Sequence, residues 1–139
     1  MKNRTTFFFV EQLVMLLVFA MAAAVCIGIF SASSRIRQKA LDQDRAVFLT
    51  QTAAELLKSC SGDLDALEEI TGGTCDVNRL TVFCSHTLQQ DPDGIYQLVI
   101  QKISGENTMV GTAAITVARK EEPDRILFSV ETAWQEVSP

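Results

Sequence analysis

The chain of 139 residues has one histidine, three prolines and no paired Cys-x-x-Cys motif. Its first proline is Pro92, so no proline interrupts a helix earlier in the chain. A Gly-rich phosphate loop and a basic patch mixed with aromatic residues are also missing from the sequence. These absences weigh against a nucleotide-binding enzyme and a zinc-ribbon domain, and we expect a non-enzymatic protein without a cofactor.

The few residues that could carry chemistry form weak patterns. Cys84 and His86 would point to the same face of a strand, but a nucleophilic pair also needs a third group that orients the base. A zinc site from Cys60, Cys75, Cys84 and His86 has enough ligands but lacks the usual paired spacing. The stretch 91–94 (DPDG) lacks the later glutamate of a calcium loop and predicts a turn. We therefore expect a surface histidine and no metal.

Charge is also scarce near the N-terminus. Residues 7–30 contain a single formal charge, Glu11, and this run is long enough to cross a hydrocarbon core of about 30 Å as a helix. Residues 31–139 hold 10 Lys/Arg and 16 Asp/Glu, a formal charge of −6. That acidic part argues against nucleic acid as a partner and gives no support for its docking on anionic lipid.

The N-terminal apolar run has three interpretations. A secretory signal would be cut after Ser33, but the run is far longer than the roughly 7–15 residues of a usual signal core. An uncleaved signal anchor would account for the length. Neither accounts for Glu11, because an acid inside a membrane is costly and uncommon without a partner or a role.

The third interpretation rests on a resemblance. A short basic leader (MKNRTT) precedes FFFVEQL and a long apolar helix, and this segment resembles the N-terminus of type IV pilins and pseudopilins. The resemblance implies a leader of residues 1–6, cleavage between Thr6 and Phe7 by a prepilin peptidase, and N-methylation of Phe7. It also implies that Glu11 pairs with the N-terminal amine of a neighbouring subunit. The family has glycine before the cut, where this chain has Thr6.

The resemblance further implies a function and a location. The chain would be a minor pilin or pseudopilin of a pilus-like, competence or secretion filament, with other subunits, an assembly platform protein and membrane lipid as partners. It would cross the cell membrane once, with a cytoplasmic N-terminus and an extracellular head. Charge alone leaves the orientation open, since Lys2 and Arg4 precede the span while Arg35, Arg37 and Lys39 follow it. The alternative is a secreted or anchored extracellular binding module without a filament role.

The remainder of the chain predicts an α+β fold. Residues 31–59 are rich in helix formers and predict an amphipathic continuation of the transmembrane helix, and residues 60–139 predict a globular head. A short helical turn over 64–70 would be capped by Asp63 and would end at Gly72-Gly73. We expect three or four antiparallel strands, chosen from 79–85, 95–104, 109–119 and 125–135, with connections at 91–94, 105–107 and 122–124. The apolar face of the helix is expected to contain Ile36, Ala40, Val47, Ala54 and Leu57, flanked by Leu41, Phe48 and Leu56.

Four cysteines complete the candidate residues. Cys26 lies in the apolar run and is expected to behave as a small hydrophobe. If the head is extracellular, one disulfide is expected among Cys60, Cys75 and Cys84, with Cys75–Cys84 ahead of Cys60–Cys75. Three unpaired thiols are the alternative.

Overall fold

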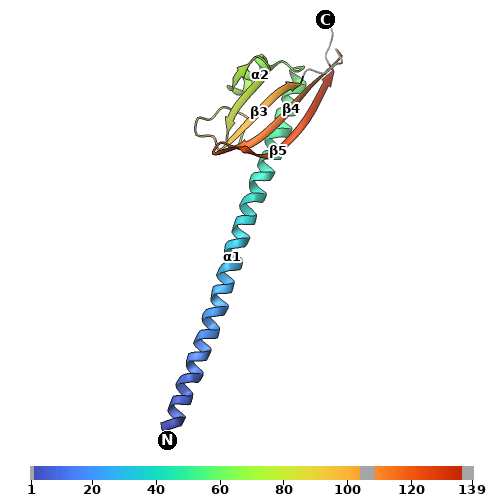
Figure 1. Ribbon diagram of the computed structural model, residues 1–139. Helices are drawn as coiled ribbons and strands as arrows, with labels where there is room; N and C mark the ends of the chain where they lie inside the picture. The colour runs from blue at the N-terminus through green and yellow to red at the C-terminus, as the bar shows by residue number, and fades with distance from the viewer. Residues whose placement is uncertain (1, 104–108, 136–139) are drawn as a thin grey trace. The chain divides into compact units, whose positions relative to one another are not determined.

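The computed structural model describes residues 2–103 and 109–135. Met1 of the predicted leader and the predicted connection at 105–107 lie outside this range. The elements occur in the order α1, α2 and then β1 to β5, which confirms the predicted α+β class (Figure 1). By its contacts the chain divides into two units, Met1–Ala40 and Leu41–Pro139, and α1 runs from the first into the second.

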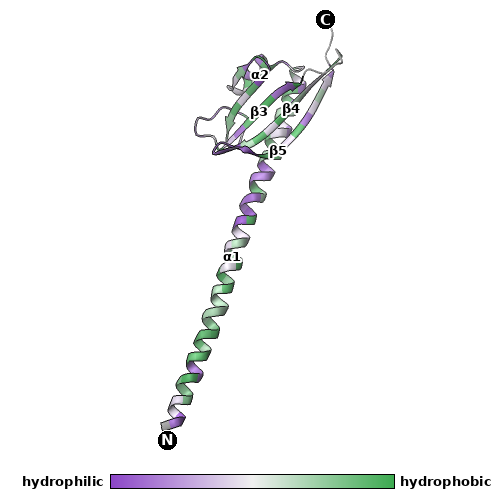
Figure 2. Cartoon of the chain, in the orientation of Figure 1, coloured by the Kyte–Doolittle hydropathy of each residue, from purple (hydrophilic) through white to green (hydrophobic). Residues whose placement is uncertain are grey.

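Helix α1 spans Lys2–Ser59 without interruption. No proline occurs within it, and Ala, Leu, Gln and Lys favour the helical backbone. In the first unit, the side chains of residues 3–40 are all exposed. The apolar stretch and the polar stretch that follows it are visible along the helix in Figure 2. Residues 3–40 therefore form no core of their own.

In the second unit, α1 packs on the sheet through one narrow stripe. The fully buried residues of this stripe recur at helical spacing: Ala46, Leu49, Thr50, Ala53 and Leu57. The predicted apolar face was therefore partly wrong. Ile36 and Ala40 were assigned to it and Leu41 and Phe48 to its flanks, yet all four are exposed. The sequence contains apolar residues in more than one helical phase, and only the sheet selects the phase that is buried.

The sheet has five strands, not three or four. They are β1 (Thr74–Asp76), β2 (Arg79–Cys84), β3 (Tyr96–Ile103), β4 (Val110–Arg119) and β5 (Glu122–Gln135), in the spatial order β1-β2-β3-β4-β5 with every pair antiparallel. β1 is too short for its alternation to be visible in the sequence. The predicted turn at 122–124 is also wrong, since Glu122 already pairs with Arg119 and residues 120–121 form the turn.

One face of the sheet buries alternate residues against α1 and α2. The core includes Leu80, Val82 and Cys84 of β2, Leu98 and Ile100 of β3, and Ala113, Ile115 and Val117 of β4. In β5 the register with β4 shifts next to Val117, where Val117 pairs with Phe128 but Ala118 pairs with Ile126. Such a bulge changes the face that a side chain occupies. Ile126 consequently remains exposed although it continues the apolar alternation of β5.

Helix α2 spans Leu64–Thr71, and its predicted cap is confirmed. The carboxylate of Asp63 accepts a hydrogen bond from the backbone N–H of Asp65 at 3.0 Å. The helix ends at Gly72. Leu64 and Leu67 turn toward the core. Of the acidic residues of α2, Asp65 and Glu69 are exposed, and Glu68 is half-buried beside β1.

Trp134 is enclosed by two glycines from distant parts of the second unit. A Cβ atom added to Gly62 or to Gly111 would overlap the indole ring. Gly62 also has φ +79°, a left-handed conformation that side chains other than glycine's strain to adopt. The close approach of these two backbones lets Trp134 reach 93% burial at the end of the sheet, since its exposed fraction is 7%.

Candidate functional site

The sequence-predicted site residues of the N-terminus lie in the first unit. Thr6, Phe7 and Glu11 are all helical and exposed, so the expected cleavage and methylation positions lie within α1 itself. Phe7 is 80% exposed. Helix α1 is long and apolar enough to cross a membrane, and its most apolar window is entirely unburied. The N-terminal region thus contains a helix suited to anchor the chain in a bilayer.

The side chains one helical turn away from Glu11 are all apolar. One turn away on either side lie Phe7, Phe8, Val14 and Met15, all more than half exposed. The nearest described base along the helix is Arg4, seven residues or about 10 Å away along the axis. Within the described residues, neither ion pair of the chain involves Glu11. Its own helix therefore provides no adjacent counter-charge.

A second polar group lies in the second unit, between α1 and the sheet. Asp42 accepts a hydrogen bond from the hydroxyl of Tyr96 at 2.7 Å and from Nη2 of Arg119 at 2.8 Å. Burial raises the pKa of Asp42, but these two hydrogen bonds and the charges of Arg119 and Arg45 outweigh that effect and lower it below its ordinary value. Asp42 therefore joins α1 to β3 and β4 as a carboxylate.

The partners of Asp42 show the matching effects. Burial, followed by the hydrogen bond to Asp42, raises the pKa of Tyr96 to about 12. The hydrogen bond to Asp42 raises the pKa of Arg119. Sequence reasoning missed this group, although a signal existed. Asp42 lies four residues before Ala46 and seven before Leu49, in the phase of the buried stripe, where a charged residue is unusual unless it is paired.

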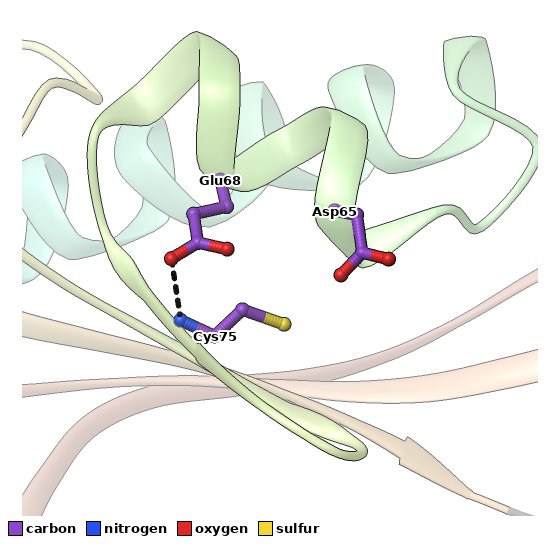
Figure 3. Close-up of side chains that lie close together, drawn as sticks. All are labelled: Asp65, Glu68 and Cys75. Carbon is purple, nitrogen blue, oxygen red and sulfur yellow. Dashed lines mark hydrogen bonds between the residues drawn. The ribbon is translucent and has the colours of Figure 1, made fainter.

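A third cluster joins α2 to β1. The ligand atoms of Asp65, Glu68 and Cys75 all lie within 4.8 Å of one another. In Figure 3 the two carboxylates face the strand that carries Cys75, and Glu68 accepts a hydrogen bond from the backbone N–H of Cys75 at 3.2 Å. Burial and the charges of Asp65 and Glu68 raise the pKa of the Cys75 thiol, which keeps it protonated. The contact that holds this cluster is structural: it ties β1 to α2.

The cysteines do not form the predicted disulfide. All four are free thiols. Cys75 pairs in register with Leu80, four residues before Cys84 on the same strand, a distance of about 13 Å along β2. A disulfide needs its two Cα atoms within about 7 Å, so antiparallel pairing of β1 with β2 prevents the Cys75–Cys84 bridge. Sequence spacing alone could not reveal this, because the prediction did not include β1.

Cys84 and His86 differ in their surroundings. Cys84 is fully buried in the core, and burial raises its pKa to about 11. His86 is exposed, and its imidazole contacts the guanidinium of Arg45. The predicted turn at 91–94 is present: Asp91 accepts hydrogen bonds from the backbone N–H of Asp93 and from the hydroxyl of Ser85. Both carboxylate oxygens of Asp91 are thereby used within the loop.

Comparison with protein-family models, curated proteins and solved structures returned no match. The functional assignment therefore depends on the chain's own residues. Of the groups described above, Glu11 has the surroundings that call most strongly for an external partner.

Proposed function

We propose that the chain is a membrane-anchored structural subunit, a minor pilin or pseudopilin of a type IV pilus-like, competence or type II secretion-like filament. The observation that carries this proposal is Glu11, a carboxylate in an exposed apolar helix with no adjacent counter-charge. The role is non-enzymatic, and the N-terminal helix is the element through which subunits assemble.

The physical basis is the cost of an isolated charge in hydrocarbon. A carboxylate without a partner is expensive in a bilayer, and a buried ammonium ion is its natural counterpart. The resemblance to pilins supplies that ammonium group as the N-terminal amine of Phe7 from a neighbouring subunit. Assembly would thereby satisfy both charges, while the apolar side chains around Glu11 exclude water from the pair.

The remaining parts of the proposal follow from the same resemblance. A prepilin peptidase would cut between Thr6 and Phe7 and methylate the new amine. The span would leave the N-terminus in the cytoplasm and the second unit outside the cell. An assembly platform protein and other subunits would be its partners, and the acidic second unit would contact neighbours along the filament.

The decisive experiment measures incorporation of the full chain into filaments in its own host. We expect Glu11→Ala and Glu11→Gln to reduce incorporation by more than about tenfold, since loss of one member of a buried charge pair leaves the other uncompensated. Glu55→Ala is the matched control, because Glu55 is an exposed acid on the same helix. If both Glu11 variants are incorporated into filaments as efficiently as the parent chain, at equal levels in the membrane, the pairing role is refuted.

Mass spectrometry of the mature N-terminus separates the processing alternatives. A methylated chain that starts at Phe7 is the expected result. A chain that starts at Ser34 would refute the proposal, because a cut after Ser33 removes Glu11 and the span together. An intact Met1 would leave two alternatives, a plain anchor and an uncleaved pilin-like protein.

A further inference from the structure

The cations of the first unit are grouped at two levels along α1. Arg35, Arg37 and Lys39, here called the basic collar, lie just beyond the apolar run, and Arg4 lies just before it. All four side chains are exposed. Arg4 and Arg35 are separated by 31 residues, or about 46 Å of helix. A typical helix tilt of about 20° reduces this to about 44 Å across the bilayer.

This separation matches the thickness of a membrane. A bilayer measures about 40–45 Å when its polar headgroups are included. With the apolar run in the hydrocarbon, Arg35 therefore lies at the level of the phosphates in one leaflet, and Arg4 of the uncleaved chain lies at that level in the other. Long basic side chains extend readily to that level while their aliphatic parts stay against lipid.

Among the described residues, neither ion pair involves the basic collar. Between Glu11 and Asp42 the sequence contains no acid. Asp42 is one turn beyond Lys39, but its two oxygens already accept hydrogen bonds from Tyr96 and Arg119. Arg35 and Lys39 are also four residues apart on one face, where two like charges destabilise a helix. An anion from outside the chain would relieve this repulsion.

The placement of the three cations indicates the kind of anion. At about 100° per residue, Arg37 projects to the side of α1 opposite Arg35, so the collar presents cations in more than one direction. A single small ion cannot contact all of them, whereas headgroups surround a membrane helix on every side. We propose that the basic collar binds the phosphates of anionic phospholipids in the leaflet next to the second unit.

This inference goes beyond filament assembly, but it rests on α1 spanning a bilayer, as in the proposed function. It also implies that the two units respond in opposite ways to an anionic lipid surface. The collar attracts anionic lipid, whereas the acidic second unit is repelled by the same surface. Anionic lipid would therefore hold the span in place and keep the second unit off the membrane.

The test uses the full chain with Phe30→Trp, which places an indole one turn and a half before the collar. The protein is reconstituted in phosphatidylcholine vesicles that contain either brominated phosphatidylglycerol or brominated phosphatidylcholine, and quenching is corrected for the chain without this substitution. We expect phosphatidylglycerol to bind next to the indole about fivefold more strongly, the effect of roughly one basic residue near an anionic surface. Salt at about 1 M should reduce this preference.

The variants separate the collar from net charge. Glutamine at all three collar positions should reduce the preference to about one, whereas Arg35→Lys with Arg37→Lys should retain it. Lys58→Gln, Arg79→Gln and Arg125→Gln together remove the same charge from exposed positions of the second unit and should leave it unchanged.

Three outcomes would count against the inference or its basis. Equal quenching by the two brominated lipids in the parent would overturn lipid binding by the collar. Equal quenching together with salt-sensitive association between copies of the chain would show that the collar binds acidic residues of a second copy. That result would likewise overturn lipid binding by the collar. Quenching by neither lipid would show that α1 is not in the bilayer, and that failure belongs to the proposed function.

Discussion

Residues 1–40 and 41–139 differ in nearly every property although one helix runs through both. The first region has five Lys/Arg and one Glu, a formal charge of +4, and the second has seven Lys/Arg and sixteen Asp/Glu, a charge of −9. The first region exposes its apolar side chains, while the second buries Leu49 and Leu57 of the same helix completely. An apolar residue among positions 3–40 thus stays exposed, whereas its counterpart in the second region packs within the fold.

One substitution made in both regions tests this contrast with the largest expected effect. Leu57→Ala should lower the free energy of unfolding of the second unit by about 3 kcal/mol, because it leaves a cavity among residues that are fully buried. Leu17→Ala, on the exposed part of the same helix, should change it by less than about 0.5 kcal/mol. Urea unfolding followed by Trp134 fluorescence in detergent measures both. Similar losses for the two variants would contradict the division into a packed and an unpacked region.

Glycine provides a second matched pair. Gly62→Ala should destabilise the second unit by about 2 kcal/mol, since the new methyl group overlaps Trp134 and the backbone is left-handed at this position. Gly28→Ala has nothing within 4 Å of its added atom and should leave that unit's stability unchanged. Thermal unfolding with the same fluorescence signal distinguishes them. An unaltered midpoint for Gly62→Ala would show that the indole does not pack against this backbone.

The smallest effect concerns the charge that joins α1 to the sheet. Because the pKa of Asp42 is lower in the fold than its ordinary value of 3.8, its carboxylate stabilises the second unit above that pH, and this contribution is lost as the pH falls below it. Asp42→Asn should cost about 1 kcal/mol near pH 7, a modest value because Arg119 is partly exposed. The difference from the parent should shrink toward pH 3.

Unfolding measured between pH 3 and 7 tests this prediction, with Asp44→Asn as the control at an exposed neighbouring position. Tyr96→Phe removes one of the two hydrogen bonds and should give an intermediate loss. If the difference in free energy of unfolding between the parent and Asp42→Asn does not vary with pH, Asp42 stabilises the fold without its charge.

Much of the fold could be predicted because local patterns carry it. The cap at Asp63 depends on residues adjacent in sequence, and the alternation of Ala113, Ile115 and Val117 matches their burial in β4. What failed needed contacts between distant segments. β1 exists because β2 offers it a partner, and the bulge beside Val117 that exposes Ile126 is a feature of strand pairing.

The candidate sites show the same division. Glu11 stands out in the sequence because the residues three and four positions away are all apolar, and these helical neighbours follow from spacing alone. The Asp42 group unites residues 54 and 77 positions apart, so no local pattern could assemble it. For the cysteines, composition suggested a pairing that the strand register prevents.

By itself, the sequence determined the uninterrupted helix, its apolar first part with one acid, and the α+β class, because propensity, length and periodicity act between near neighbours. Only the tertiary structure decided which face of α1 is buried, how many strands the sheet has, which carboxylate binds Tyr96 and Arg119, and that Cys75 lies too far from Cys84 for a disulfide. These features depend on which distant surfaces meet, and a surface is selected by the free energy of the whole packed unit rather than by any one segment of it.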